Sequence, residues 1–384
     1  MSDSEQLKSR FRELYGQEAR VYRAPGRVNL IGEHTDYNEG FVFPAAINLF
    51  TWVAIAPRSD LQVHIRSENL QKTAEFKLSS ESGNANRDWS SYISGVALAL
   101  EQNGFELKGA DLLVRGDVPL GGGLSSSAAL EVAVGFALLA NSDLTVDCRE
   151  LAQLCQKAEN DFVGMRCGIM DQLASACCRK EHALLLDCRS LEYRTFKLPP
   201  NLRLVICNSM VKRELAASAY NTRRAECEEG VRILARRFPE VRALRDATMN
   251  QLEACQAELP QNVYKRCRHV ITENQRVLEA AEALEHNRLE DLRRAMAESH
   301  SSLRDDYEVS SDELDVLVEI ASRVKGVHGA RMTGAGFGGC TINLVESEAV
   351  DEFRNEISAE YRRRTKLNPD IYVCNAADGV KRAD

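Results

Sequence analysis

The sequence lacks three features that would place it in large classes of protein. It has no basic excess, because 49 lysines and arginines against 57 aspartates and glutamates give a net charge of −8, and a broad nucleic-acid surface needs a basic face. Its longest apolar stretch, residues 128–140, is interrupted by Glu131 and is too short to cross a bilayer. Its amphipathic N-terminal residues lack the apolar segment of a signal peptide. We therefore expect neither nucleic acid nor a membrane among its partners.

Cysteine is plentiful, but the spacing that disulfide or zinc frameworks need is missing. The twelve cysteines include no C-x-x-C pair, and the only close pair is the adjacent Cys177 and Cys178. Scattered thiols in a long chain are typical of a reducing compartment, where they serve as small buried hydrophobic groups. We therefore expect a cytoplasmic protein without a disulfide framework or a zinc site.

The length and the order of local patterns indicate two lobes. At 384 residues the chain exceeds the ~250–300 residues at which single cores stop growing. The first half alternates extended and helical patterns, with extended runs at 51–56 and 110–115 and helices at 91–102, 126–140 and 148–160. The second half is rich in charged helices, one of them opening with a capping-box pattern from Ser310 to Glu313. The turn-like residues 198–201 are the best boundary, so we predict an α+β chain with lobes at 1–200 and 201–384.

An unusual polar segment follows an early strand-like run. The apolar residues 28–31 lead directly into Glu33, His34, Asp36 and Tyr37. Four hydrogen-bonding side chains in this place are poor material for a core and unusual material for a turn. The segment therefore indicates a polar binding site.

Two glycine loops are candidates for binding phosphate. Glycines 121–123 and serines 125–127 stand before a strong helix pattern, so backbone amides at a helix N-terminus can face an anion. No G-K-[ST] follows, which excludes a Walker A loop, and no HRD or DFG occurs downstream. The alternative is a glycine turn and a serine N-cap. The second loop, 333–339, precedes a strand rather than a helix, which excludes a Rossmann site and leaves a tight turn or a second wall beside the phosphates.

A third segment contains a candidate base. Asp171 follows the apolar pair Ile169 and Met170, and Gly164 and Gly168 shape the preceding loop. A carboxylate with apolar neighbours can serve as a base or an orienting group. The alternative is that Asp171 caps the helix that follows.

Together and in this order, these segments resemble the signatures of the GHMP small-molecule kinases. "GRVNLIGEHTDY" looks like the galactokinase signature, and the likeness continues through "PLGGGLSSSAALEVA", "CGIMDQ", "VKRELAASAYNTRRAEC" and "RMTGAGFGGC" over nearly the whole chain. The resemblance implies a mixed β-sheet lobe, a helix-rich α/β lobe and an active site in the cleft between them. It further implies ATP-dependent phosphorylation of the anomeric hydroxyl of D-galactose to galactose 1-phosphate, with ATP and Mg²⁺ required.

The resemblance also implies roles for individual residues. The catalytic pair would be Asp171 and Arg27. The sugar would contact Glu33, His34, Asp36, Gly168, Asp171 and Tyr220. The nucleotide would contact Gly121, Gly122, Gly123, Leu124, Ser125, Ser126, Ser127 and Trp89. Magnesium would be held by Ser127 and Glu159, in keeping with its preference for few protein oxygens plus phosphates.

Several interpretations stay open from the sequence. The sugar could be N-acetylgalactosamine, galacturonate or arabinose, since such kinases would share most of these motifs. A non-catalytic sensor of galactose and ATP should show a damaged serine loop or a lost base, whereas both are intact here. Arg166 touches phosphate or faces solvent, and Cys167 is an accessible thiol or a small apolar filler. We expect galactose and ATP as the partners of a monomer or a weak dimer.

Overall fold

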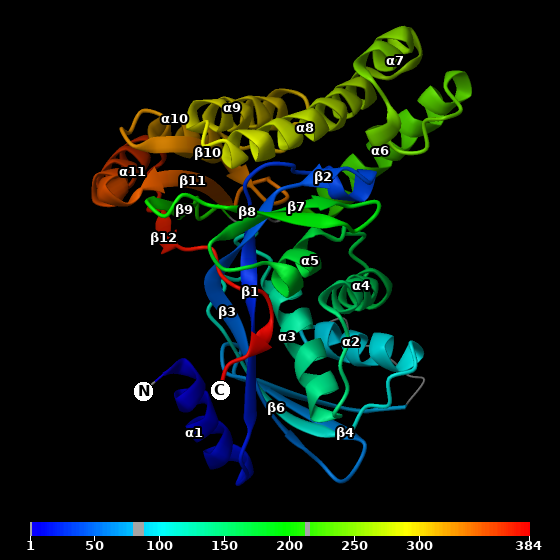
Figure 1. Ribbon diagram of the computed structural model, residues 1–384, viewed down its shortest axis with the longest axis vertical. Coiled ribbons are helices and arrows are strands. Elements are labelled where there is room, and N and C mark those ends of the chain that lie inside the picture. Colours follow the sequence, from blue (N-terminus) through cyan, green and yellow to red (C-terminus); the bar gives the residue numbers. More distant parts are fainter. Residues whose placement is uncertain (1, 80–87, 212–215) are drawn as a thin grey trace.

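The computed structural model describes residues 2–79, 88–211 and 216–384, which form two lobes stacked along the long axis (Figure 1). The predicted α+β, two-lobed architecture is confirmed. Residues 212–215, which belong to the "VKREL" part of the galactokinase-like motifs, lie outside the described residues. Within the described ranges, no helix combines the length and the apolar character that a membrane span needs.

The first lobe is built on a six-stranded sheet in the order β13-β1-β3-β6-β4-β5. Only β4 and β6 run parallel among its pairs, and β1 pairs with β3 across a bulge between Pro25 and Arg27. The strands are β1 (Arg20–Asn29), β3 (Pro44–Pro57), β4 (Gln62–Ser67), β5 (Lys72–Lys77), β6 (Ala110–Gly116) and β13 (Lys381–Arg382). The division of the chain at residue 200 stays a prediction, and the last strand, β13, lies in this first sheet.

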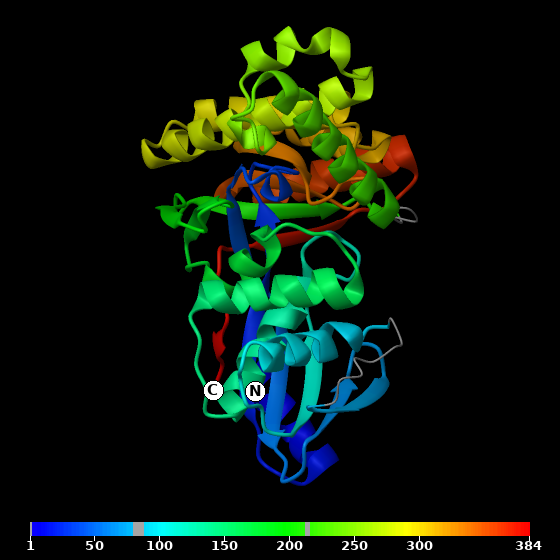
Figure 2. The same ribbon diagram turned by 90° about the vertical axis from the view of Figure 1, so that its right-hand side faces the viewer.

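Helices cover one face of this sheet, as Figure 2 shows from their side. They are α2 (Ser91–Gln102), α3 (Ser126–Asn141), α4 (Cys148–Ala158), the π-helix η2 (Glu159–Val163) and α5 (Met170–Cys177). The helix α1 (Asp3–Tyr15) lies against the other face (Figure 1) and begins with a capping box between Ser2 and Glu5. Leu7 and Phe11 of α1 are fully buried, so the sheet has an apolar core on both sides.

The second lobe is built on an antiparallel sheet in the order β10-β11-β9-β12. Along β9, Leu204 and Ile206 join the core under α8 and α9, whereas Val205 and Cys207 join the core under α10 and α11. This alternation is the period of two that a strand covered on both faces requires. The elements are β9 (Leu202–Asn208), β10 (Val327–Thr333), β11 (Cys340–Glu346), β12 (Asp370–Cys374), α8 (Gln261–Glu285), α9 (Leu289–Asp305), α10 (Asp312–Ala321) and α11 (Val350–Thr365).

A three-stranded sheet lies between the two lobes (Figure 1). Its strands are β2 (Phe41–Val42), β7 (His182–Asp187) and β8 (Tyr193–Lys197). The remaining elements are α6 (Ala216–Arg237), α7 (Met249–Ala254) and the short 3-10 turns η1 (Asp36–Asn38), η3 (Leu244–Asp246), η4 (Gln256–Glu258) and η5 (Ser347–Ala349). The capping box predicted from Ser310 to Glu313 is wrong: the N-cap of α10 is Ser311, whose hydroxyl accepts from the Leu314 amide. The Ser310 hydroxyl bonds to Asp315 instead.

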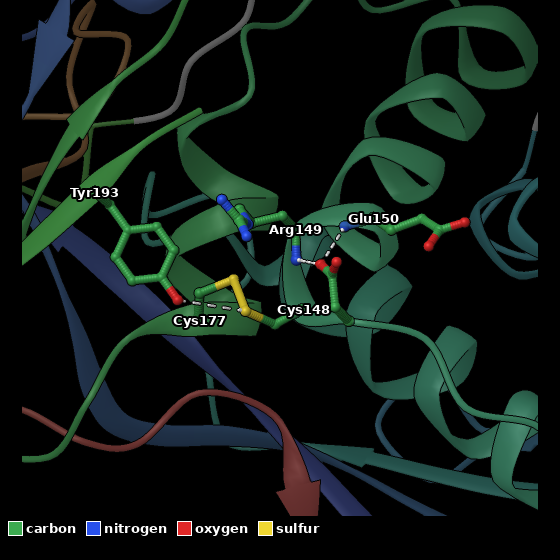
Figure 3. The surroundings of a disulfide bond; sticks show 6 residues. Cys148, Arg149, Glu150, Cys177 and Tyr193 are labelled. Atoms are coloured by element: carbon green, nitrogen blue, oxygen red, sulfur yellow. Dashed lines mark hydrogen bonds between the residues drawn. A yellow bond between two sulfur atoms is a disulfide. The ribbon is translucent and has the colours of Figure 1, made fainter. Parts of the chain in front are cut away.

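The expectation of a chain without disulfides is wrong at one pair. Cys148, the first residue of α4, is bonded to Cys177, the last residue of α5, with their Cα atoms 5.5 Å apart (Figure 3). The Tyr193 hydroxyl lies 3.7 Å from the Cys148 sulfur. No local pattern indicated this pairing, because 29 residues separate the two cysteines and only the packing of α4 on α5 brings them together.

Candidate active site

Most of the predicted site residues line one cavity of about 290 Å³ between the lobes. The first lobe supplies the sugar-signature loop, the glycine–serine loop and the start of α5, and the second lobe supplies Tyr220, Gly334 and Ala335. The predicted residues that line it are Arg27, Glu33, His34, Asp36, Gly121, Gly123, Ser125, Ser126, Ser127, Glu159, Gly168, Asp171 and Tyr220. Gly122, Leu124 and Trp89 do not line it. The buried Leu124 nevertheless accepts a hydrogen bond from the Arg27 amide through its carbonyl.

Asp171 and Arg27 form an ion pair in this cavity. Arg27 Nε and Nη2 reach Asp171 Oδ1 at 2.9 and 2.7 Å, and Arg27 Nη1 donates to the Gly123 carbonyl at 2.7 Å. The arginine side chain is 5% exposed and the aspartate side chain 30% exposed. Asp171 lies in the first turn of α5, whose N-cap position is Ile169, so the alternative that Asp171 caps this helix is excluded. Its carboxylate is instead directed to Arg27 and to the Ser125 hydroxyl.

The glycine–serine loop presents the N-terminus of α3 to the cavity. Gly121, Gly123 and Ser125 have left-handed backbone conformations, with φ of 72°, 78° and 58°. Ser125 occupies the N-cap position without a side-chain cap bond, because its hydroxyl donates to Asp171 Oδ2 at 2.5 Å. The alternative that this loop serves only as a glycine turn with a serine N-cap is therefore wrong in one respect, because the Ser125 side chain makes no cap hydrogen bond. The amides of this first helical turn, with the positive end of the helix dipole, suit a phosphate group.

The sugar-signature loop is hydrogen-bonded to three residues of α8, His269, Glu273 and Asn274, which we call the α8 clamp. The Gly32 amide donates to Glu273 Oε1 and the Phe41 amide to Asn274 Oδ1, both at 2.9 Å. His269 Nε2 lies 3.1 Å from the Glu33 carbonyl. Burial alone would raise the pKa of Glu273. The charge of Arg276, followed by His269, Arg331 and the hydrogen bond from Ser299, lowers this pKa to about 2. The carboxylate of the clamp is therefore ionised. Sequence reasoning missed these residues.

Two carboxylates of the signature loop differ in their surroundings. Glu33 Oε1 accepts from the Gly334 amide at 2.7 Å and Oε2 from Asn29 Nδ2 at 3.0 Å, so the second glycine loop forms a wall of the site. Asp36 Oδ1 accepts from the Tyr37 amide at 2.9 Å. Burial, followed by the Asp171 charge, raises the pKa of Asp36 to about 7.

Gly168 lies in direct contact with Asp36. A Cβ at Gly168 would overlap the Asp36 carboxylate. Only glycine therefore lets the loop before α5 approach Asp36 this closely.

His34 already has a protein partner at each ring nitrogen. Nε2 lies 3.2 Å from the Ala335 carbonyl, which can only accept, so Nε2 carries the proton and Nδ1 accepts from the Tyr37 hydroxyl at 2.8 Å. Burial lowers the pKa of His34 to about 3, which keeps the ring neutral. Tyr220 packs on this histidine with ring centroids 5.5 Å apart, and burial raises the pKa of its hydroxyl. Both residues line the cavity, and their sugar contacts stay predictions.

Trp89 lines a second cavity of about 250 Å³ that adjoins the first. Ser126 and Ser127 line both cavities, so the second one begins where the phosphate loop ends. Its other lining residues are mostly apolar and come from separate strands, helices and loops: Thr51, Ser67, Asn69, Leu70, Tyr92, Val114, Gly116, Val118, Leu120 and Leu130. Such a cavity suits a flat purine base. Apart from Trp89 and Tyr92, which stand three residues apart at the start of a helix, no local pattern in the sequence marks these residues.

Ser127 and Glu159 line the same cavity, and the Ser127 hydroxyl is one of the neighbours that lower the pKa of the Glu159 carboxyl. Burial, then the Asp171 charge, raises the pKa of Glu159 to about 7. Burial, then the Glu159 charge, raises the pKa of Glu131 well above its ordinary value. Buried acidic groups that form no ion pair within the described residues fit a place where a divalent ion belongs. In the described part of the chain, no group of three or more histidines, cysteines or acidic residues could hold a metal alone.

The two residues whose roles the sequence left open are also placed. Arg166 forms an ion pair with Glu228 at 2.8 Å, and its side chain is 54% exposed, so it faces solvent. Cys167 lies 3.4 Å from both Glu159 Oε2 and Asn160 Oδ1. Burial raises the pKa of this thiol well above its ordinary value, which disfavours the reactive thiolate.

Comparisons with known proteins agree with this geometry. The GHMP kinase N-terminal domain matches residues 91–179 and the GHMP kinase C-terminal domain matches residues 280–363, which defines the class of the fold. The galactokinase galactose-binding signature matches residues 9–57. A galactokinase of Roseiflexus sp. (strain RS-1) is 51% identical over 100% of this chain and 98% of its own length. One of Chloroflexus aggregans is 48% identical, covering 96% and 95%.

Solved structures place the fold in the same group. The Lactococcus lactis galactokinase, solved with galactose, has a TM-score of 0.95 and 37% identity, with all of both chains covered. The Methanococcus jannaschii mevalonate kinase has a TM-score of 0.67 at 20% identity, covering 94% of this chain and 99% of its own, and shares the fold. The chain belongs to the galactokinase family of the GHMP kinases.

Proposed function

We propose that this chain transfers the γ-phosphoryl group of ATP to the anomeric hydroxyl of D-galactose and releases ADP. The observation that carries the proposal is the ion pair between Asp171 and Arg27. It lies in the cavity that the sugar-signature loop and the glycine–serine loop both line. The sequence identity of 51% and 48% to two galactokinases supports galactose as the sugar.

In the proposed reaction, Asp171 accepts or orients the proton of the anomeric hydroxyl. That oxygen forms a bond to the γ-phosphorus while the bond from this phosphorus to the β,γ-bridging oxygen breaks, and ADP leaves. Arg27 stabilises the Asp171 carboxylate and lies beside the Gly123 carbonyl of the phosphate loop. Positioning and charge supply most of the catalysis, because the phosphoryl transition state is loose.

The sugar would be bound by both carboxylates of the signature loop and by groups around them. Two acceptor oxygens suit a vicinal diol, and a site built for a hydroxyl strongly rejects its absence. We assign this work to Glu33 and Asp36, with further contacts from His34, the Gly168 backbone and Tyr220. A magnesium ion would be held by the Ser127 hydroxyl and the Glu159 carboxylate, and when bound it neutralises charge on the phosphates.

The decisive test is ADP release with ATP and Mg²⁺ over a panel of sugars. The panel contains galactose, N-acetylgalactosamine, galacturonate, arabinose, glucose and a sample without sugar. Turnover selective for galactose is the expected result. Turnover with another sugar would change the substrate, and galactose binding without turnover would contradict the enzyme assignment.

We also infer a cytoplasmic enzyme that acts as a monomer or a weak dimer. Ten cysteines of the described chain, among them the buried Cys155 and Cys267, are free thiols, which supports a reducing compartment, and the Cys148–Cys177 disulfide is the exception to this pattern. Sedimentation velocity over a range of protein concentrations tests the oligomeric state.

A further inference from the structure

One buried side-chain amide, that of Gln172, hydrogen-bonds two carboxylates from different helices. Gln172 follows Asp171 in the first turn of α5. Its Nε2 lies 2.6 Å from Glu159 Oε2 and 2.9 Å from Glu131 Oε2, so both amide N–H groups are used. Gln172 and Glu131 have no exposed surface, and Glu159 is 3% exposed. Bonds between such buried polar groups strongly restrict where each side chain can lie.

These bonds link the three helices that surround the phosphate end of the site. Glu131 lies four residues after Ser127 on α3, so the two side chains share one face of that helix. The hydrogen bonds run from Glu159 through Gln172 to Glu131 on α3, and Ser127 of the same helix lines the cavity together with Glu159. The backbone changes from α4 to the π-helix η2 at Glu159 itself.

The donors to Glu159 converge on one of its oxygens. Gln172 Nε2 and Cys167 Sγ both donate to Oε2, at 2.6 and 3.4 Å. Glu159 also lines the cavity. A carboxylate held in this way through one oxygen has a defined orientation in which its other oxygen can serve a ligand.

We propose that Gln172, anchored on Glu131, is a positioning residue that holds the Glu159 carboxylate in the orientation that binds the divalent ion of the metal–ATP complex. This proposal rests on the proposed function and deepens it. Because Gln172 follows Asp171 directly, one turn of α5 orients both the base and the metal ligand. Gln172 does not line the cavity, so its removal should affect the metal rather than the sugar.

The test substitutes Gln172→Met, which keeps the length of the side chain and removes its amide. Mn²⁺ replaces Mg²⁺ as the probe, and its binding is followed by electron paramagnetic resonance with the β,γ-imido analogue of ATP, without turnover. Loss of an outer partner of a metal ligand typically weakens metal binding about 10–100-fold, and we expect that loss here. Galactose affinity, measured by calorimetry, should be unchanged, and higher Mg²⁺ should restore turnover.

Three further variants keep the test decisive. Gln153→Met makes the same change at an exposed position on α4 and should bind Mn²⁺ as the parent does. Glu131→Met removes the anchor and should weaken Mn²⁺ binding, whereas Glu131→Gln keeps an acceptor oxygen and should restore it. If Gln172→Met does not fold, Glu131→Met and Glu131→Gln together still test the positioning role.

Parent-like Mn²⁺ affinity in both Gln172→Met and Glu131→Met, with weakened affinity in Glu159→Gln, would overturn the positioning role. The proposed function fails differently: the parent protein would then release no ADP with galactose.

Discussion

The Ser125 hydroxyl donates a 2.5 Å hydrogen bond to Asp171 Oδ2, across the junction of the phosphate loop and α5. The other carboxylate oxygen, Oδ1, is bonded to Arg27. Arg27 in turn donates to the Gly123 carbonyl of the same loop. The base and the phosphate loop are therefore one bonded unit, and a movement of the loop displaces the carboxylate.

Asp171→Asn tests the base. The amide has nearly the same shape but cannot take a proton, so ADP release should fall by about 10²–10⁴-fold. Calorimetry should show galactose binding largely preserved. A variant that turns over within a few-fold of the parent would exclude Asp171 as the base.

Gly168→Ala tests the contact between the loop before α5 and Asp36. The added methyl group would overlap the Asp36 carboxylate, so the loop or the side chain must move and the KM for galactose should rise about ten-fold or more. The matched control is Gly116→Ala, whose Cβ would meet nothing closer than 3.7 Å. Because Gly116 lines the second cavity, the two variants are compared by the calorimetric affinity for galactose without nucleotide. Equal galactose affinity in both variants would refute the role of this contact.

Asp36→Asn tests the pH dependence of stability without sugar. The pKa of Asp36 is raised to about 7 in the folded chain, whereas the pKa of an aspartate in an unfolded chain is about 4. The folded chain thus binds more protons between these values, and the contribution of Asp36 to the free energy of unfolding falls as pH rises through about 7. The Tm of Asp36→Asn relative to the parent should therefore increase from about pH 5 to about pH 8. A pH-independent difference in scanning fluorimetry would contradict this.

Glu273→Gln tests the α8 clamp. The buried carboxylate accepts from the Gly32 amide, from Ser299 and from Arg276, and the amide leaves some of these donors unsatisfied. An unsatisfied buried group costs about 1–3 kcal/mol, so the KM for galactose should rise about ten-fold with a smaller change in kcat. Glu279→Gln, at an exposed position of the same helix, is the control. A KM equal to that of the control would show that the clamp does not position the sugar loop.

Cys148→Ser tests the disulfide between α4 and α5. Closing a loop with a sequence separation of 29 residues should contribute about 2–4 kcal/mol to the free energy of unfolding. Urea titration should show that reductant destabilises the parent to the level of the variant and leaves the variant unaffected. Insensitivity of the parent to reductant, with Cys148 and Cys177 both alkylated in the native protein, would show that the bond is absent.

Local sequence patterns predicted much of the fold and most of the cavity. The helix expected at 91–102 has those bounds in the structure, because its apolar side chains recur at the helical period and face one core. The signature, serine and base segments each have a local pattern, and the fold brings all three to one cavity.

What the sequence did not reveal depends on contacts between distant segments. Glu273 and Asn274 look like ordinary polar positions of a charged helix until the fold places the signature loop against them. The apolar cavity that Trp89 lines is formed by single residues from several elements. In the sequence, its apolar residues look the same as residues of a buried core. The pairing of Cys148 with Cys177 likewise follows from how two helix ends meet.

The α8 clamp also has a consequence for the order of events during synthesis. Gly32 and its partner Glu273 are separated by 241 residues, so the ribosome must make most of the chain before this bond can form. Contacts of such long range form late because the entropy of closing the intervening loop must be overcome first. A nascent first lobe therefore emerges with its signature loop unsupported. Galactose can stabilise the folding protein only in the last stage, after α8 has docked.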